Sequence, residues 1–257
     1  MKAINEIEQI LLDAVNDGAF PGANYAIVTK NKVWMGSVGN KELYPSIIPN
    51  SIDTIYDMAS LTKVVCTTTC LMQLVEKGLL RIFDPVSRYF DKFKFTNITV
   101  WNLMTHTSGL PEGIAGPKDK IRESDVWDKI FAIEELNYKP GTKISYSDIN
   151  YILLGKIIEI LSGMSLNEYA KKNLFEPLEM VDSGYLPLDK SRCAATEYRN
   201  DATMTGYVKG DVHDETAYAM NKVAGHAGLF STVTDCSHFI QMILNDGVYN
   251  GKKILSK

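Results

Sequence analysis

The sequence predicts an α/β (α+β) protein built from a sheet layer with an inserted helical lobe. Two β-prone runs, Ala23–Thr29 and Val33–Val38, lie near the N-terminus around Lys30-Asn31-Lys32 and indicate a hairpin. The middle of the chain is instead rich in apolar residues at helical spacing, in the run Val64–Leu80 and again from Tyr151 to Leu161. Because strands and helices in separate stretches pack as layers, these observations together predict the fold class.

The individual elements follow from local signals. Charged and apolar residues mix at helical spacing over residues 1–18, which predicts an amphipathic helix. Residues 39–53 are polar and turn-rich, and they lead to a helix that begins at Ser60 or Leu61 and ends at Gly78, a left-handed cap. Its core-facing stripe is expected to comprise Val64, Val65, Thr68, Leu71, Met72 and Val75. Further helices are predicted at 101–105, 123–136, 148–163, 166–174 and 235–244, the fourth of them with a capping box.

The predicted organisation is a single interleaved unit. Residues 1–60 and 200–257 are assigned to an α/β lobe, and residues 61–199 to a helical lobe. The sequence contains no internal repeat and no linker of biased composition, so no further domain boundary is expected.

Composition narrows the class of partners. The chain has 257 residues, of which 45% are hydrophobic and 23% charged, with a formal net charge of -4. No basic run exceeds a pair, which argues against a nucleic-acid partner, and no apolar stretch approaches the ~20 residues of a membrane span. Charges interrupt the first helix, so we expect a cytoplasmic protein; an exported protein with its leader removed would look the same. The oligomeric state is left open.

Cysteines and histidines do not predict a metal site. Cys66, Cys70, Cys193 and Cys236 are few and scattered, as expected for reduced core thiols, and no second Cys/His pair has ligand spacing. We therefore expect no metal and no cofactor. His213-Asp214 with His226 could form a cluster that contacts a metal or a substrate, but the spacing defines no ligand geometry. His106 is expected to support its loop.

Ser60 and Lys63 form a candidate pair of nucleophile and base. They stand three residues apart, so both side chains leave the same face at the start of the helix. Ser60 could instead be an ordinary N-cap, although a capping box would place an acid at position 63. The helix dipole and partial burial favour the neutral amine of a lysine here, and that amine can accept a serine proton. About one Ser-x-x-Lys is expected by accident, so spacing alone leaves both interpretations open.

Tyr146 is a second candidate. The segment Tyr146-Ser147-Asp148 lies where an extended piece enters a helix, and such transitions often present side chains to a cleft. A phenol beside an ammonium group releases its proton more readily, so Tyr146 could relay protons beside Lys63. The alternative is that Tyr146, one of 13 tyrosines, only packs.

Three extended blocks resemble, in order and spacing, the serine β-lactamase and penicillin-binding protein superfamily. They are Ser60-Leu61-Thr62-Lys63, Leu103-Met104-Thr105-His106-Thr107-Ser108-Gly109-Leu110-Pro111 and Tyr146-Ser147-Asp148-Ile149-Asn150-Tyr151-Ile152-Leu153-Leu154-Gly155. The resemblance runs from about Phe20 onward and is strongest to the class C β-lactamases, family VIII esterases and D-amino-acid peptidases. It implies a β-lactamase/transpeptidase-like fold, an antiparallel sheet flanked by helices with an inserted all-α lobe, and favours Ser60 as nucleophile.

By position, the resemblance implies three catalytic residues. Ser60 would be the nucleophile, Lys63 the general base and Tyr146 the phenol that relays protons. Ser60 would attack an amide, lactam or ester carbonyl and form an acyl-enzyme that water then releases. The backbone N–H of Ser60 would be one of two oxyanion donors.

The second motif departs from the family pattern. The family usually carries Tyr-x-Asn at this place, whereas here Asp148 holds the position of the asparagine. Whether Asp148 orients Lys63 or the substrate is therefore open. Asp148 and Asn150 are both kept as candidate substrate-binding residues.

The third motif is the other departure. The family carries Lys-Thr-Gly or His-x-Gly on a strand near its C-terminus, and His226-Ala227-Gly228 has matching letters. However, Leu-Phe-Ser-Thr and a helix follow it, which resembles the family block that comes before the third motif. We therefore expect a fragment whose sheet is incomplete and whose third motif is missing. The alternative is that His226 and Gly228 have been recruited to bind substrate.

Together these expectations predict a metal-independent serine hydrolase that acts on a small-molecule or peptide substrate. The segments Asp211–Asp214 and Gly225–Phe230 resemble a branch that includes cell-wall-fragment amidases, which favours cell-wall-derived peptides or muropeptides. An esterase of the same fold, or a catalytically silent binding protein on this scaffold, are the alternatives. A fragment without the third motif could be inactive.

Overall fold

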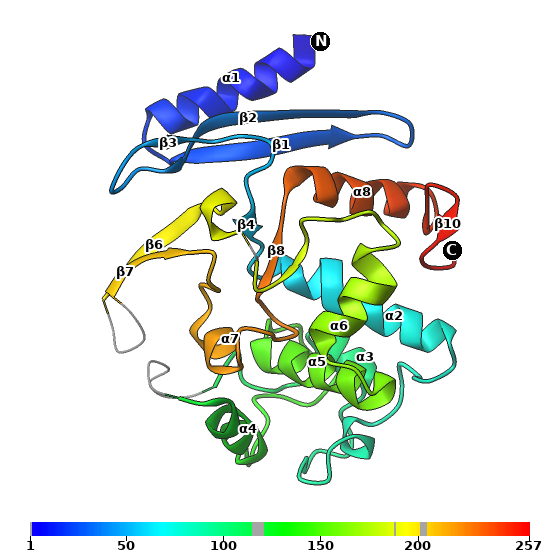
Figure 1. Ribbon diagram of the computed structural model, residues 1–257. Helices are drawn as coiled ribbons and strands as arrows, with labels where there is room; N and C mark the ends of the chain where they lie inside the picture. The colour runs from blue at the N-terminus through cyan, green and yellow to red at the C-terminus, as the bar shows by residue number, and fades with distance from the viewer. Residues whose placement is uncertain (1, 115–120, 188, 201–204) are drawn as a thin grey trace.

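The computed structural model describes residues 2–114, 121–187, 189–200 and 205–257, so that Met1 of the predicted first helix lies outside the described residues. Figure 1 shows a sheet layer between two helices, α1 (Lys2–Asn16) on one face and α8 (Val233–Leu244) on the other, above a body made mainly of helices. The predicted fold class, an antiparallel sheet flanked by helices with an inserted helical part, is confirmed.

The main sheet is built on the predicted hairpin. β1 (Gly22–Val28) pairs antiparallel with β2 (Val33–Glu42) from Gly22↔Gly39 to Val28↔Val33. β3 (Ile48–Pro49) then adds to the free side of β2. The segment 39–53, predicted to be polar and turn-rich, therefore also contributes the end of β2 and all of β3 to the sheet. The polar end of β2 remains in the sheet because Glu42 is buried against Lys209 from another strand pair.

A second small sheet connects distant parts of the chain. Its central strand is β8 (Leu229–Ser231), with β4 (Tyr56–Asp57) on one side and β5 (Gly184–Tyr185) on the other. Both pairings are antiparallel, and the Met58 N–H extends the ladder to the Leu229 carbonyl at 2.8 Å. The sheet therefore holds the chain just before residue 60 against the chain just after residue 228.

The remaining elements lie around the helical body. Two further antiparallel pairs are formed by β6 (Ala195–Asn200) with β7 (Thr205–Lys209) and by β9 (Val248–Tyr249) with β10 (Lys252–Lys253). The other helices are α2 (Thr69–Glu76), α3 (Val100–Met104), α4 (Glu123–Phe131), α5 (Asp148–Ser162), α6 (Leu166–Ala170) and α7 (Glu215–Ala219). Single turns occur at η2 (Val86–Arg88) and η4 (Lys190–Arg192), and π-turns at η1 (Lys63–Thr68) and η3 (Lys171–Phe175).

The residues predicted to cap helix ends do so in the structure. α5 ends at Gly163, whose φ of +69° makes it a left-handed cap, and Gly78 adopts the same conformation after α2. Ser165 and Glu168 form both hydrogen bonds of the predicted capping box of α6. The predicted helix 123–136 is shorter than expected and ends at Phe131.

The π-turn η1 changes which side chains of the predicted helix face the core. Its wider spacing rotates the first turn relative to α2. Val65 and Leu71 are buried as expected, whereas Val64 is 50% exposed. The expectation that Val64 faces the core is therefore wrong. π-Turns of this kind occur frequently at functional sites.

α5 is the centre of the hydrophobic core. Residues 149–155, 157 and 158 are buried, so that the helix is covered on nearly every side, as expected for a helix that is apolar all round. It approaches the chain at Gly225 closely: a Cβ on Gly225 would lie 2.1 Å from the Tyr151 carbonyl oxygen and 2.9 Å from the Cα of Gly155. Only glycine at both positions permits this contact.

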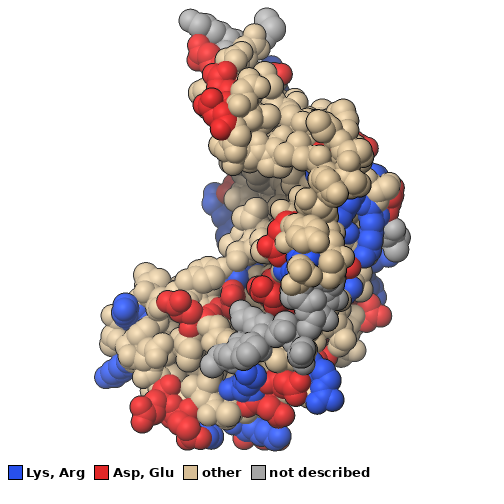
Figure 2. Space-filling model, turned by 90° about the vertical axis from the view of Figure 1, so that its left-hand side faces the viewer, with Lys and Arg blue, Asp and Glu red and all other residues tan. Residues whose placement is uncertain are grey.

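The predicted division into two lobes stays a prediction. Residues 61–199 were assigned to the helical lobe, but this range contains β5, and its boundary cuts β6. β5 pairs with β8 of the other predicted lobe. On the face shown in Figure 2 the surface is hollowed beneath the sheet layer, and acidic and basic side chains are interspersed over the lower part.

Among the described residues no single helix is both long and apolar enough to cross a membrane. α5 and the segment Leu166–Phe175 satisfy the length and composition criteria only as a pair bent by 74°.

The contact between Gly155 and Gly225 gives a test of the packing. Gly225→Ala is expected to lower the free energy of unfolding by about 1–3 kcal/mol, because the added methyl group has no space against the Tyr151 carbonyl. Gly184→Ala is the matched control, since a Cβ there meets no atom within 4 Å and should change stability by less than about 0.5 kcal/mol. Urea unfolding measures both; equal stability of the two variants would contradict this packing.

Candidate active site

Ser60 lies on a short loop held by the strands around it. At the end of β4, the carboxylate of Asp57 accepts hydrogen bonds from the backbone N–H groups of Ala59 and His213, both at 2.8 Å. Burial raises the pKa of the Asp57 carboxyl, and these two N–H groups oppose that effect. Ala59 has a φ of +43°, a conformation that alanine adopts only when its surroundings impose it. Ser60 is left exposed, and the N-cap position of η1 is held by Thr62 instead.

Lys63 reaches Ser60 from the first turn of η1. Its Nζ donates to Ser60 Oγ at 3.1 Å and to the His226 carbonyl oxygen at 2.9 Å, and it lies 2.7 Å from Asp148 Oδ1. The side chain is only 3% exposed. Of these three neighbours of Nζ, the Asp148 carboxylate and the His226 carbonyl can only accept hydrogen bonds, so Ser60 Oγ is the one that can also give a proton to Nζ.

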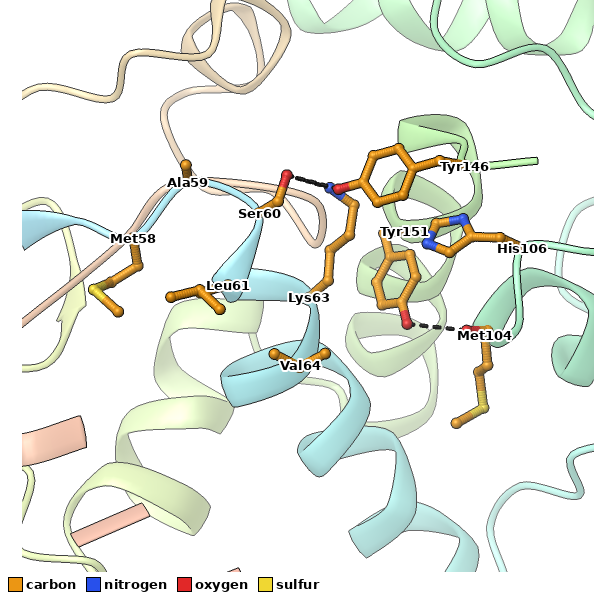
Figure 3. Close-up of a pocket in the computed structure, with 10 residues that line it drawn as sticks. All are labelled: Met58, Ala59, Ser60, Leu61, Lys63, Val64, Met104, His106, Tyr146 and Tyr151. Carbon is orange, nitrogen blue, oxygen red and sulfur yellow. Dashed lines mark hydrogen bonds between the residues drawn. The ribbon is translucent and has the colours of Figure 1, made fainter. Parts of the chain in front are cut away.

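Tyr146 completes the contacts to the serine. Its hydroxyl donates to Ser60 Oγ at 2.6 Å, and its ring centroid lies 4.7 Å from Lys63 Nζ. The side chain enters from the extended segment before α5 and is 48% exposed. Figure 3 shows the serine, the lysine and the phenol converging from two separate segments. The structure therefore brings together the three residues that the resemblance assigned to catalysis.

These groups open onto a cavity of about 530 Å³. Besides the three residues above, its lining comprises Met58, Ala59, Leu61, Val64, Met104, His106 and Tyr151. A volume of this size is typical of small-molecule sites, in which a few polar groups act within an apolar lining. Chemically, the arrangement offers an exposed hydroxyl that accepts hydrogen bonds from two possible proton carriers.

Asp148 contacts Lys63. It is the first residue of α5, where the helix dipole favours a negative charge, and its Oδ1 forms the ion pair with Nζ. The sequence left open whether this carboxylate orients the lysine or the substrate. The ion pair supports the first role, since Asp148 lies outside the cavity lining.

Asn150 does not line the cavity, and its predicted role in binding substrate stays a prediction. Its side chain is fully buried: Oδ1 accepts a hydrogen bond from Ser108 Oγ at 2.7 Å, and Nδ2 lies 3.2 Å from His106 Nδ1. Two steps along a helix rotate the side chain by about 200°, so Asp148 and Asn150 face different sides of α5.

His106 lies behind Tyr146 at the edge of the cavity. Its ring stacks on the Tyr146 ring with centroids 4.5 Å apart and 28° between the planes. Its backbone, with a φ of +55°, accepts a hydrogen bond from the Ser145 N–H at 2.9 Å, in line with the expected support of the loop. Burial, and then the charge of Lys63, hold the pKa of the His106 imidazole below its ordinary value.

His226 and Gly228 lie on the loop behind Lys63, and their predicted contact with substrate stays a prediction. The His226 ring is 1% exposed and bonds Asp214 Oδ1 through Nε2 at 2.8 Å; only its carbonyl oxygen reaches the site, through Lys63. Gly228 has a φ of +111°, and a Cβ there would lie 3.1 Å from the Tyr185 ring. The matching letters of the third motif therefore mark a packed loop rather than a strand that lines the cavity.

The other histidines make separate contacts. His213 Nε2 lies 3.0 Å from Glu197 Oε2, and the ring of His238 stacks on Tyr249. Within the described part of the chain, no group of three or more His, Cys, Asp or Glu side chains is arranged to hold a metal ion. Three of the four cysteines are buried and all four are free.

Sequence reasoning missed three residues that build the site. Tyr151 lines the cavity and donates to the Met104 carbonyl at 3.1 Å. Thr62 accepts the Leu229 N–H at 3.1 Å, and Thr67 donates to the Gly225 carbonyl at 2.7 Å, so both fasten η1 to the loop that carries His226. Helical spacing could have indicated Thr67, which stands one turn after Lys63, but nothing in the sequence identifies its partner.

Comparison with known proteins gives a consistent result. The family model described as Beta-lactamase matches residues 7–257. An N-acetylmuramyl-L-alanine amidase of Bacillus subtilis (strain 168) is 32% identical over 285 residues, which cover 96% of this chain and 64% of that protein. The chain spans 63–67% of the length of the first curated relatives it matches.

Solved structures agree on the fold. FmtA from Staphylococcus aureus superposes with a TM-score of 0.74 at 26% identity, covering 96% of this chain and 67% of that one. The octameric penicillin-binding protein homologue from Pyrococcus abyssi gives a TM-score of 0.73 at 24% identity, covering 98% of this chain and 58% of that one.

The low pKa of His106 predicts a pH dependence of stability. The ordinary histidine pKa is about 6.5, so below that pH the unfolded chain binds a proton that the folded protein excludes. The His106 contribution to folding is therefore lost as the pH falls through about 6.5. The difference in free energy of unfolding between wild type and His106→Phe should narrow from about pH 8 to about pH 5, as measured by urea titration. A difference that stays constant or widens would contradict this environment.

Proposed function

The chain belongs to the β-lactamase family, and from that premise we propose that it is a serine hydrolase whose nucleophile is Ser60. The observation that carries the proposal is the convergence of Lys63 Nζ and Tyr146 OH on Ser60 Oγ, at 3.1 and 2.6 Å, at the edge of an open cavity. A structural N-cap would have no need of an exposed hydroxyl with two such partners.

The proposed reaction is acyl transfer. Ser60 Oγ attacks the carbonyl carbon while its proton passes to the lone pair of Lys63, which acts as the neutral amine. Tyr146 gives its hydroxyl proton to the leaving nitrogen or oxygen as the bond from that atom to the carbonyl carbon breaks, and it takes the proton from Lys63 in return. Water then attacks the acyl-enzyme, and Ser60 recovers its proton by the reverse route. The backbone N–H of Ser60 has no hydrogen-bond partner among the described residues, which supports its role as an oxyanion donor.

Asp148 and His226 are proposed to position the base. The carboxylate of Asp148 and the carbonyl oxygen of His226 hold Nζ from two sides, so that the remaining direction of Nζ faces Ser60. This arrangement restricts Lys63 to the geometry that proton transfer needs.

Peptides or muropeptides derived from the cell wall are the proposed substrates. The matching amidase of Bacillus subtilis is named for an amide bond of this material, and an apolar lining from Leu61, Val64 and Met104 suits small alkyl side chains such as that of alanine. Esterase activity on the same scaffold is the second candidate, favoured by the wide opening of Ser60 to solvent.

Covalent labelling tests the proposal. Incubation with a fluorescent penicillin should give a stoichiometric adduct that peptide mass spectrometry places on Ser60. Ser60→Ala should abolish it, whereas Ser46→Ala, an exposed serine of the loop before β3, should label like wild type.

The other outcomes separate the alternatives. Labelling only by a fluorophosphonate would replace the peptide-directed proposal with the esterase. A folded chain that neither reagent labels would overturn the hydrolase and leave the silent binding protein.

A further inference from the structure

Hydrogen-bond directions fix the protonation of His106. The backbone N–H of Ser147, which can only donate, points at His106 Nδ1 at 3.1 Å, so Nδ1 must be an acceptor without a hydrogen. The amide Nδ2 of Asn150 meets the same nitrogen at 3.2 Å. A neutral imidazole with an accepting Nδ1 carries its proton on Nε2.

A buried chain of bonds prevents the opposite arrangement. The Leu110 N–H donates to Ser108 Oγ at 3.1 Å, and Ser108 Oγ donates to Asn150 Oδ1 at 2.7 Å. Turning the Asn150 amide to present its oxygen to His106 would break the hydrogen bond that Asn150 Oδ1 accepts from Ser108 Oγ. Since Ser108 and Asn150 are both buried, the loss of that bond is costly. The low pKa of His106 agrees with a ring that stays neutral.

The protonated edge of the ring faces the cavity. Tyr146 and Tyr151 pack against His106 with ring centroids at 4.5 and 5.2 Å, and Nδ1 is engaged on the side of α5. His106 lines the cavity, and no described residue bonds its Nε2. In Figure 3 the ring lies beside Tyr151 with an edge directed toward Lys63.

The other polar groups of the cavity already have roles. Ser60, Lys63 and Tyr146 belong to the proposed reaction, and the Tyr151 hydroxyl donates to the Met104 carbonyl. Asp148 can only accept hydrogen bonds when ionised, and its Oδ1 is paired with Lys63. A substrate carbonyl other than the one attacked would therefore find its donor at His106.

We propose that His106 binds the substrate directly, its Nε2–H donating a hydrogen bond to a carbonyl oxygen in the acyl part of the substrate. The inference rests on the proposed function and makes it narrower: the favoured acyl donor carries an amide carbonyl close to the bond that is cleaved. Asn150 and Ser108 are positioning residues that act through His106. The buried amide of Asn150 in the second motif then orients the His106 ring.

Two matched esters test the contact. The nitrophenyl ester of N-acetylglycine and nitrophenyl pentanoate have acyl chains of the same length, but only the first has a second carbonyl. His106→Phe keeps a ring against Tyr146 and removes both nitrogens; His106→Asn tolerates the left-handed backbone and can still accept the Ser147 N–H. For each variant we compare kcat/KM for the acetylglycyl ester with kcat/KM for the pentanoyl ester. The ratio of the first to the second should fall about tenfold relative to wild type in both variants, because one hydrogen bond to the substrate is lost.

Controls separate binding from support. His238→Phe replaces a histidine that also stacks on a tyrosine, at 4.9 Å, but lies outside the cavity, and it should leave the ratio unchanged. If His106 only supports Tyr146, both esters lose activity equally and the ratio stays at the wild-type value. That result, or unchanged rates for both esters, would overturn the proposal.

A measurement without turnover separates this inference from the proposed function. Nitrogen NMR of wild-type protein with labelled histidine at neutral pH should show His106 as the neutral tautomer protonated at Nε2, assigned by the signal lost in His106→Asn. A proton on Nδ1, or an imidazolium, would overturn the inference even if the chain hydrolysed both esters. If His106 shows the expected tautomer but no reagent labels Ser60, the proposed hydrogen-bond donor at His106 stands. Only the proposed hydrolase activity is then overturned.

Discussion

The site depends on a buried lysine whose partners are its neighbour Ser60 and two segments distant in the sequence. Lys63 is almost fully covered, and a buried amine is tolerated only when polar partners surround it. Ser60, Asp148 and the carbonyl of His226 supply them. The fold must therefore bring the start of α5 and the loop after α7 to the same turn of helix.

Two packing features meet that demand. The ladder of β4 with β8 fixes the chain on both sides of the site, and the close approach of Gly155 and Gly225 lets the loop lie directly on α5. Thr67 fastens the same loop to η1. These contacts are between backbones or to backbones, so side chains that line the cavity can change without moving Lys63. This is typical of a scaffold that proteins with different names share.

The sequence predicted what depends on local signals and extended motifs. The hairpin, the capped ends of α5 and α6, and the assembly of Ser60, Lys63 and Tyr146 all follow from such patterns. The sequence did not predict the features that depend on tertiary packing. The strands β4, β5 and β8 are two or three residues long and show no alternation of polar and apolar residues. The π-turn that exposes Val64 has no sequence signature. The letters around His226 matched a motif whose burial they could not reveal. The cytoplasmic location and the two-lobe division stay predictions.

Lys63 is proposed to activate Ser60 because its buried partners fix its position. The most direct measurement is the rate constant for acylation by a β-lactam in Lys63→Met, which preserves side-chain length and apolar volume while removing the amine. We expect a fall of about 10²–10⁴-fold, the usual contribution of a general base, in a protein that remains folded by circular dichroism. Acylation of the folded variant at the wild-type rate would contradict it.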